Sequence, residues 1–417
     1  MLSFSGGLWR HQHFMLLWTA QTVSLFGTQV TILALPTVAI LLLHASPVEV
    51  GVLVAIPWLA YLCIGLFAGV IVDHFPRRRI MIVADIGRAI ALGSIPLAFA
   101  LDLQSIAQLY SIAAVVGVLN VFFEVAYQAY LPTLLEQNQL IEGNAKLAIG
   151  EAAALTGGPA LGGLLIGAVG AAMALVVDAS SYLISALCIT SMTKRKELPP
   201  QHSVVRISSV FAEIGEGIGL VIHHPIIRTL ASVSALQNFG ESVAGPMLLL
   251  FMYRSLHLTP IIVGLTLTVG SAGFLLGAAS VSSITRKLGI GRMLWFSSLF
   301  GVSAYLLLPL GVLGIPVVWV GLWRLFLGLH MPTYNVNVIS VRQKLIPDRL
   351  QGRVNATTRT LVLGIQGVGP LVGGALGALW GPVPTILCGG ALFLLGSLPI
   401  LTRAVITLKE HSSTEVA

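Results

Sequence analysis

The sequence predicts an all-α membrane protein with twelve transmembrane helices, arranged as two six-helix bundles with pseudo-twofold symmetry. Composition, the length of the apolar runs and an internal repeat lead to this fold class. Hydrophobic residues make up 56% of the 417-residue chain and charged residues 9%, whereas ordinary soluble domains contain about 25% charged residues. The mean hydropathy is +0.92. A bilayer accepts any helix with about 20 apolar residues, but a soluble core would not hide this much apolar surface.

Twelve apolar runs of spanning length follow one another, separated by short polar stretches. None alternates in polarity as a transmembrane β-strand does, so helices are the expected spanning elements. The predicted spans are residues 14–43, 49–72, 80–101, 105–128, 147–168 and 171–191 in the first half, and 226–252, 261–284, 293–313, 315–339, 357–380 and 383–403 in the second half.

Positive charges decide the predicted orientation. The chain has 23 Lys and Arg residues; only Arg254 falls in a loop on the side opposite the N-terminus, and Arg88, Arg324 and Arg359 lie within predicted spans. The others gather on the side of the N-terminus. Because basic residues accumulate in cytoplasmic loops, both termini are predicted to be cytoplasmic in a multi-pass protein of a prokaryotic plasma membrane. This asymmetry explains the net charge of +7, so no nucleic-acid partner is expected.

Sequence motifs give no sign of an enzyme. The chain contains no HExxH zinc motif, no GxGxxG turn and no GxxxxGK[ST] phosphate loop, so neither a metal nor another cofactor is predicted. Its three cysteines all lie in apolar spans, which favours neither a disulfide framework nor a metal site. Without a nucleotide site, transport energy has to come from an ion or substrate gradient.

The longest polar stretch divides the chain near its middle. It predicts an N-terminal bundle (1–192), a cytoplasmic linker (193–225), a C-terminal bundle (226–404) and a cytoplasmic tail (405–417). Within the linker, Phe211, Ile214, Ile218 and Val221 recur at helical spacing, which predicts an amphipathic helix on the membrane surface. This helix is either a tether or a regulatory element.

An internal repeat relates the two halves. A shift of 211 residues superimposes the stretch GGPALGG, residues 157–163, on GVGPLVGG, residues 367–374. Glycines on one helix face let another backbone approach closely, and the proline removes one backbone donor. The matched residues are Gly158, Pro159, Gly162 and Gly163 in the fifth span and Gly369, Pro370, Gly373 and Gly374 in the eleventh.

The chain resembles the major facilitator superfamily over essentially its whole length. The loop GVIVDHFPRRR, residues 69–79, is similar to that family's signature of Gly, three residues, Asp and a basic cluster, with Pro76 where the family usually has Gly. The GPxxGG element resembles its antiporter motif. ADIGRA (84–89) and ALP (34–36) resemble its drug-efflux branch, which includes macrolide and enterobactin exporters.

This resemblance implies two conformational elements. In the family the fifth and eleventh spans lie where the halves meet, so their glycine faces would form a moving interface; static packing is the alternative. Asp73 would face the N-terminal end of the eleventh span, where the helix dipole and Arg359 would stabilise its carboxylate. With Gly69, Arg77 and Arg78 it would form a conformational latch, although the arginines could serve topology and lipid headgroups alone.

The resemblance also implies that the first, fourth, seventh and tenth spans line a central cavity. Charged residues in a span are costly and therefore point to function. The proton-coupling candidates are Glu241, Glu124 and Asp178, and the substrate-cavity candidates are Gln21, Gln29, Asn238, Arg324, His330 and Asn335. Asp85 and Arg88 are expected to form a structural pair.

Several of these candidates keep a second interpretation. Glu241 could form a fixed pair with Arg324, and Glu124 could be a solvated residue near its helix end. Arg324 could bind a substrate carboxylate instead. His330 is either a proton relay or a packed polar residue.

The sequence thus favours a secondary transporter that exports small drug-like amphipathic molecules in exchange for protons and works as a monomer in the bilayer. A substrate-specific exporter or facilitator without proton coupling, for example of a siderophore or metabolite, is the first alternative. A receptor that does not transport is the second.

Overall fold

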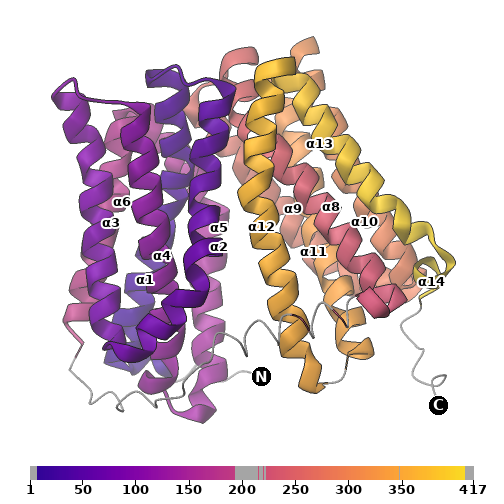
Figure 1. Ribbon diagram of the computed structural model, residues 1–417, viewed down its shortest axis with the longest axis horizontal. Helices are drawn as coiled ribbons and strands as arrows, with labels where there is room; N and C mark the ends of the chain where they lie inside the picture. The colour runs from indigo at the N-terminus through magenta and orange to yellow at the C-terminus, as the bar shows by residue number, and fades with distance from the viewer. Residues whose placement is uncertain (1–6, 193–214, 216–218, 220–221, 347, 409–417) are drawn as a thin grey trace. The chain divides into compact units, whose positions relative to one another are not determined.

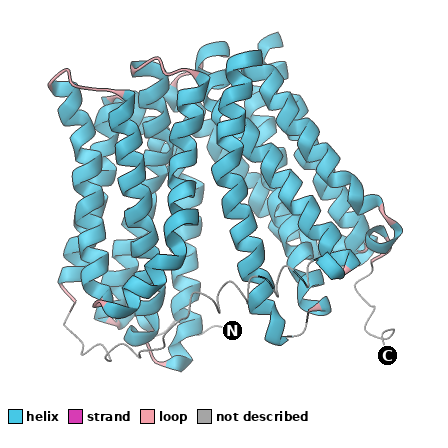
Figure 2. Ribbon diagram, in the orientation of Figure 1, coloured by secondary structure: helices cyan, strands magenta, loops and turns pink. Residues whose placement is uncertain are grey.

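The computed structural model describes residues 7–192, 215, 219, 222–346 and 348–408, and these residues are almost entirely helical, with no strand among them (Figures 1 and 2). The long helices of this part are α1 (Gln12–Thr37), α2 (Pro47–His74), α3 (Arg77–Ala100), α4 (Ile106–Leu134), α5 (Leu140–Val169), α6 (Ala171–Thr190), α8 (Pro225–Leu250), α9 (Pro260–Leu288), α10 (Ile290–Leu307), α11 (Pro316–Leu345), α12 (Asp348–Trp380) and α13 (Pro382–Ser397). They confirm the predicted all-α membrane fold.

Short helical segments adjoin these long helices. They are η1 (Leu8–Arg10), η2 (Val38–Leu42), η3 (Gln137–Gln139), η4 (Phe251–Ser255), η5 (Leu308–Leu313), η6 (Leu398–Leu401) and α14 (Arg403–Ile406). The segments η2 and η4 are π-helical.

Ten of the long helices in the described part are long and apolar enough to cross a membrane by their own composition. The other two are α8 and α11, which contain Glu241 and Arg324. A charge at the bilayer centre costs about 2.5–3.5 kcal/mol on insertion scales, so such helices depend on their neighbours in the bundle or on water in a cavity.

Several helices begin before the apolar runs that predicted them. The fifth starts at Leu140 instead of residue 147, and the eleventh span corresponds to α12, which starts at Asp348 instead of residue 357. Hydropathy detects only the apolar part of a helix, whereas the backbone ladder continues through polar turns that have their own partners. In the first turns of α5, Lys146 Nζ lies 2.7 Å from Glu142 Oε1.

Contacts divide the described chain into two compact units. Unit 1 falls within residues 1–45, 56–204 and 259–265, and unit 2 falls within 46–55, 205–258 and 266–417. The domain boundaries drawn from the sequence remain a prediction. The amphipathic linker helix, with Phe211, Ile214, Ile218 and Val221, and residues 409–417 of the tail lie outside the described residues.

The same helix pairs pack together in both units. In unit 1, α1 packs against α5 and α6, and α3 packs against α4 and α6. In unit 2, α8 packs against α12 and α13, and α10 packs against α11 and α13. Each unit is therefore built from the repeat that the sequence shows.

Backbone details follow the same repeat. Gly170 between α5 and α6 has a φ of 85°, and Gly381 between α12 and α13 has a φ of 84°; only glycine adopts this region readily. The π-helical segments that end α1 and α8 are followed by His44 and His257, each with a φ of 52°. Turn geometry is therefore duplicated together with the helix order.

The glycine motifs bring helices of each unit into close contact. A Cβ atom added to Gly162 would lie 3.4 Å from the Cα atom of Val30 on α1. In unit 2, a Cβ added to Gly373 would lie 3.2 Å from the Cα atom of Val243 on α8. One face of each motif therefore serves the packing of α1 on α5 and of α8 on α12.

Gly163 and Gly374 form the other face. A Cβ on Gly163 would lie 2.6 Å from the carbonyl oxygen of Pro260 and 2.7 Å from the Cα of Gly264, in the part of α9 that belongs to unit 1. A Cβ on Gly374 would lie 2.9 Å from the carbonyl oxygen of Pro47, in the part of α2 that belongs to unit 2. No side chain separates these backbones, as in close helix contacts of membranes generally.

We therefore expect Gly163→Ala to lower the transport rate several-fold, because the new methyl group meets fixed backbone atoms. Gly157→Ala is the matched control in the same helix, since a Cβ there would meet only the Phe26 ring, at 3.5 Å. Alanine is apolar, so both variants should insert normally. Efflux rates at equal amounts of membrane protein measure the effect, and equal rates for the two variants would show that this contact does not matter for transport.

Candidate functional site

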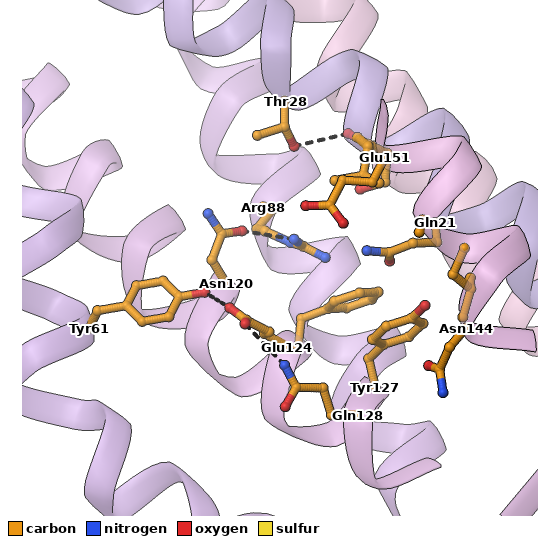
Figure 3. Close-up of a pocket in the computed structure, with 15 residues that line it drawn as sticks. Gln21, Thr28, Tyr61, Arg88, Asn120, Glu124, Tyr127, Gln128, Asn144 and Glu151 are labelled. Atoms are coloured by element: carbon orange, nitrogen blue, oxygen red, sulfur yellow. Dashed lines mark hydrogen bonds between the residues drawn. The ribbon is translucent and has the colours of Figure 1, made fainter. Parts of the chain in front are cut away.

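A cavity of about 580 Å³ lies in unit 1 and is lined by α1, α2, α3, α4 and α5 (Figure 3). The lining mixes amide, hydroxyl and charged groups with aromatic and aliphatic side chains. Its residues are Gln21, Ser24, Leu25, Thr28, Tyr61, Arg88, Asn120, Phe123, Glu124, Tyr127, Gln128, Asn144, Leu147, Ala148 and Glu151.

Arg88 on α3 is the positive charge of this lining. Its Nη2 atom forms an ion pair with Asp85 one helical turn earlier, and its Nη1 atom donates to Asn120 Oδ1 at 2.8 Å. Its guanidinium carbon lies 4.4 Å from the ring centre of Phe123 and 4.1 Å from that of Tyr182. The side chain is thus neutralised by Asp85 and held between two aromatic rings.

Glu124 on α4 is a fixed carboxylate of the cavity. It accepts hydrogen bonds from the Tyr61 hydroxyl of α2 and, at 3.1 Å, from Gln128 Nε2 one turn later on α4 (Figure 3). Charge-assisted bonds of this kind are strong and directional. The carboxylate therefore keeps one position at the edge of the cavity.

Glu151 on α5 is different. Its side chain is exposed at the cavity, and among the described residues it makes no hydrogen bond and no ion pair. Its charge acts on the phenol of Tyr127 across the cavity. Water is its present partner in a membrane protein that leaves this cavity open, because a carboxylate without any partner is costly.

Asp178 on α6 lies in the core of unit 1, where none of its surface is exposed. Its carboxylate accepts hydrogen bonds from the Thr31 hydroxyl at 2.5 Å and from Ser181 Oγ at 3.0 Å. The charges of Arg88 and Asp85 act on it as well. It does not line the cavity, but it belongs to the buried polar group behind Arg88.

Glu241 and Arg324 both lie in unit 2, half-buried on α8 and α11. Their charges interact, but no salt bridge joins them; Arg324 Nε instead donates to the carbonyl oxygen of Leu267 at 3.2 Å. The buried Tyr305 hydroxyl, which has no hydrogen-bond partner, also feels both charges. The structure therefore brings the two predicted residues into one electrostatic group without a direct contact.

The other predicted cavity residues have varied surroundings. Gln21 lines the unit 1 cavity, whereas Gln29 packs at Gly158, where a Cβ would lie 2.6 Å from Gln29 Cγ. In unit 2, the Asn238 amide donates to the Ser234 carbonyl oxygen at 2.8 Å.

His330 and Asn335 on α11 contrast with each other. His330 is buried, with Nδ1 2.8 Å from the carbonyl oxygen of Ser297 and its ring 5.1 Å from that of Phe393. These contacts resemble those of a packed polar residue. Asn335, in contrast, is exposed.

The predicted latch residues Gly69 and Asp73 lie near the end of α2 in unit 1. Arg77 Nη1 donates to the carbonyl oxygen of Ala129 at 3.0 Å, and Arg78 Nε donates to that of Ile189 at 3.0 Å. The arginines thus bind carbonyl groups near the C-terminal ends of α4 and α6, where cations are favourable. Arg359 belongs to α12 in unit 2, and its side chain lies outside the described residues.

Sequence analysis missed most of the cavity lining, namely Tyr61, Arg88 as a lining residue, Asn120, Gln128, Asn144 and Glu151. The signal was a helical stripe. Residues 21, 24, 25 and 28 of α1 and residues 120, 123, 124, 127 and 128 of α4 recur at spacings of three and four, so that each set shares one face. Polar residues on one face of an apolar helix mark a wetted surface.

The sequence profile of the Major Facilitator Superfamily matches residues 17–370. The chain belongs to this superfamily. The multidrug efflux pump Tap of Mycolicibacterium fortuitum is 29% identical over 92% of this chain and 91% of its own length. The enterobactin exporter EntS of Escherichia coli is 21% identical over 94% of this chain and 92% of its own length.

Among solved structures, the nucleoside transporter NupG matches with a TM-score of 0.76 at 10% identity, covering 93% of this chain and 98% of NupG. At that identity the likeness concerns the fold alone. The resemblance seen in the sequence motifs is thus confirmed: the protein is a multi-pass membrane transporter of small molecules, related to efflux pumps, and not an enzyme.

Proposed function

We propose that this transporter exports small amphipathic, drug-like molecules across a prokaryotic plasma membrane by alternating access, in exchange for protons. The unit 1 cavity is the observation that carries the proposal, because amide, phenol and carboxylate groups share its lining with Phe123 and Leu147. Its volume of about 580 Å³ falls within the roughly 300–1,000 Å³ of small-molecule sites. The likeness to Tap multidrug efflux pumps supports the export of drug-like compounds.

Orientation is part of the proposal. The bias of Lys and Arg toward the loops on the side of the N-terminus supports cytoplasmic termini. The backbone contacts at Gly163 and Gly374 support a role in alternating access, since surfaces without side chains slide with little steric resistance. The latch of Asp73 with α12 belongs to the same proposal, and we expect one protein chain to suffice for transport.

Glu241 is the first candidate for the proton site. It is half-buried in a spanning helix and has no salt bridge to Arg324 or to any other described residue. A carboxylate in that position gains most from binding a proton when its surroundings become drier. Glu124 and Asp178 are the other candidates; both already accept hydrogen bonds, which hold them in place.

The proposal is tested with purified protein in liposomes under an imposed pH gradient. The test compounds are ethidium, Nile red and fluorescein, which carry a positive charge, no charge and a negative charge. We expect uphill accumulation of at least one dye, abolished when nigericin collapses the pH gradient. Dye movement that never exceeds equilibrium and ignores the gradient would indicate a facilitator instead. No movement of any dye would contradict drug export.

A further inference from the structure

The charge of the unit 1 cavity is unbalanced. Its lining contains three charged side chains, Arg88, Glu124 and Glu151, and the first is already neutralised by Asp85, which lies outside the lining. Two carboxylates remain without a basic partner in the cavity. Clefts lined by one sign of charge concentrate ligands of the opposite sign, because their low-dielectric walls focus the field.

The aromatic side chains beside these carboxylates already hold a cation. The Arg88 guanidinium lies over Phe123, and the Tyr127 ring stacks parallel to Phe123 at 6.2 Å with an interplanar angle of 10°. Tyr127 is half-buried, lines the cavity and interacts electrostatically with Glu151. A ligand cation at Tyr127 would thus meet both a ring face and a carboxylate, a combination that favours organic cations over metal ions.

Gln21 adds an independent observation. Its Oε1 atom is buried, lines the cavity and accepts no hydrogen bond from any described residue. A buried acceptor left unpaired costs about 1–3 kcal/mol, and a ligand N–H group would recover that cost. Every unsatisfied or unbalanced group that we find in this lining, apart from Arg88 Nε, is therefore an acceptor or an anion.

We infer that the unit 1 cavity binds lipophilic organic cations, with Glu151 as the mobile counter-ion, Glu124 as a second and fixed carboxylate, and Tyr127 as the ring that meets the cation; this inference names the substrate class and rests on the proposed export function. Amines, guanidines and quaternary ammonium or phosphonium compounds with an apolar body belong to this class. Binding exchanges the water at Glu151 for the cation.

Tetraphenylphosphonium and tetraphenylborate test the inference, because they have the same shape and opposite charge. Their affinities for the purified full-length protein are measured by titration calorimetry in the same detergent, with protein-free micelles as the blank. We expect the phosphonium to bind more tightly than the borate. Glu151→Gln should weaken phosphonium binding at least about tenfold, since a charge pair at effective ε of 20 is worth this much or more. Glu151→Asp, which keeps the charge, should retain most of the affinity.

Asp102→Asn is the matched control, because it removes one negative charge from an exposed loop position with a φ of 56°, which asparagine also tolerates. It should bind the phosphonium like the wild type. Equal affinity of the wild type for the two ions, or a Glu151→Gln variant that binds the phosphonium as tightly as Asp102→Asn, would overturn the inference. Export of Nile red or fluorescein by the wild type would then leave the proposed function standing, whereas failure to move any dye would contradict the function independently of these affinities.

Discussion

Replacing Arg88 by methionine is expected to destabilise the protein by about 3–5 kcal/mol, the range measured when one partner of a buried ion pair is removed. Asp85 would remain with none of its surface exposed and with Ser185 Oγ, at 2.7 Å, as its remaining hydrogen-bond donor. The stacking on Phe123 and Tyr182 would be lost as well. In a membrane-spanning helix no bulk water replaces these partners.

Arg79→Met is the control for this change, since Arg79 is exposed on the same helix and the variant alters the net charge equally. The double variant Asp85→Asn/Arg88→Met should recover a large part of the loss, because both charges are then removed together. The apparent melting temperature and the monodisperse fraction of purified protein measure the effect. If Arg88→Met proved as stable as Arg79→Met, the pair would not hold unit 1 together.

Glu241→Gln should abolish uphill transport while leaving substrate exchange intact. Glutamine has the shape of the protonated side chain, so the variant behaves as a carrier that never releases its proton. Substrate can then move down its own gradient in either direction, but a pH gradient no longer drives accumulation. Counterflow of labelled ethidium and gradient-driven accumulation, both measured in proteoliposomes, separate the two activities.

Asp102→Asn again provides the matched loss of one charge, and it should behave as the wild type in both assays. The outcome against this assignment is clear: Glu241→Gln protein that still accumulates ethidium with the wild-type dependence on pH. In that case the proton site lies elsewhere, and Glu124 and Asp178 are the residues to change next.

The fold could be predicted from the sequence because the bilayer leaves few choices. Runs of about 20 apolar residues predict the spans, and the repeat of residues 157–163 at 367–374 predicts two related bundles. The helix ends could not be predicted in the same way. The first turns of α5 are polar, and their pairing of Glu142 with Lys146 does not register in hydropathy.

The candidate site was predicted only in part. The spacing of three between Asp85 and Arg88 was sufficient to anticipate their pairing, because residues one turn apart on a helix meet directly. The remaining partners depend on how helices pack. Nothing in the sequence near Glu124 announces Tyr61, which comes from another helix, and nothing near Glu151 announces the stacked rings of α4.

Proton movement caused by substrate is the most direct measure of the account. Liposomes that contain the purified protein and the pH indicator pyranine are held at equal pH inside and outside, with valinomycin and potassium clamping the membrane potential. If the protein exchanges substrate for protons, ethidium added outside enters the lumen while protons leave, so the lumen becomes more alkaline, and Glu241→Gln protein gives no such signal. Ethidium that enters at the wild-type rate without any change in luminal pH would contradict the account.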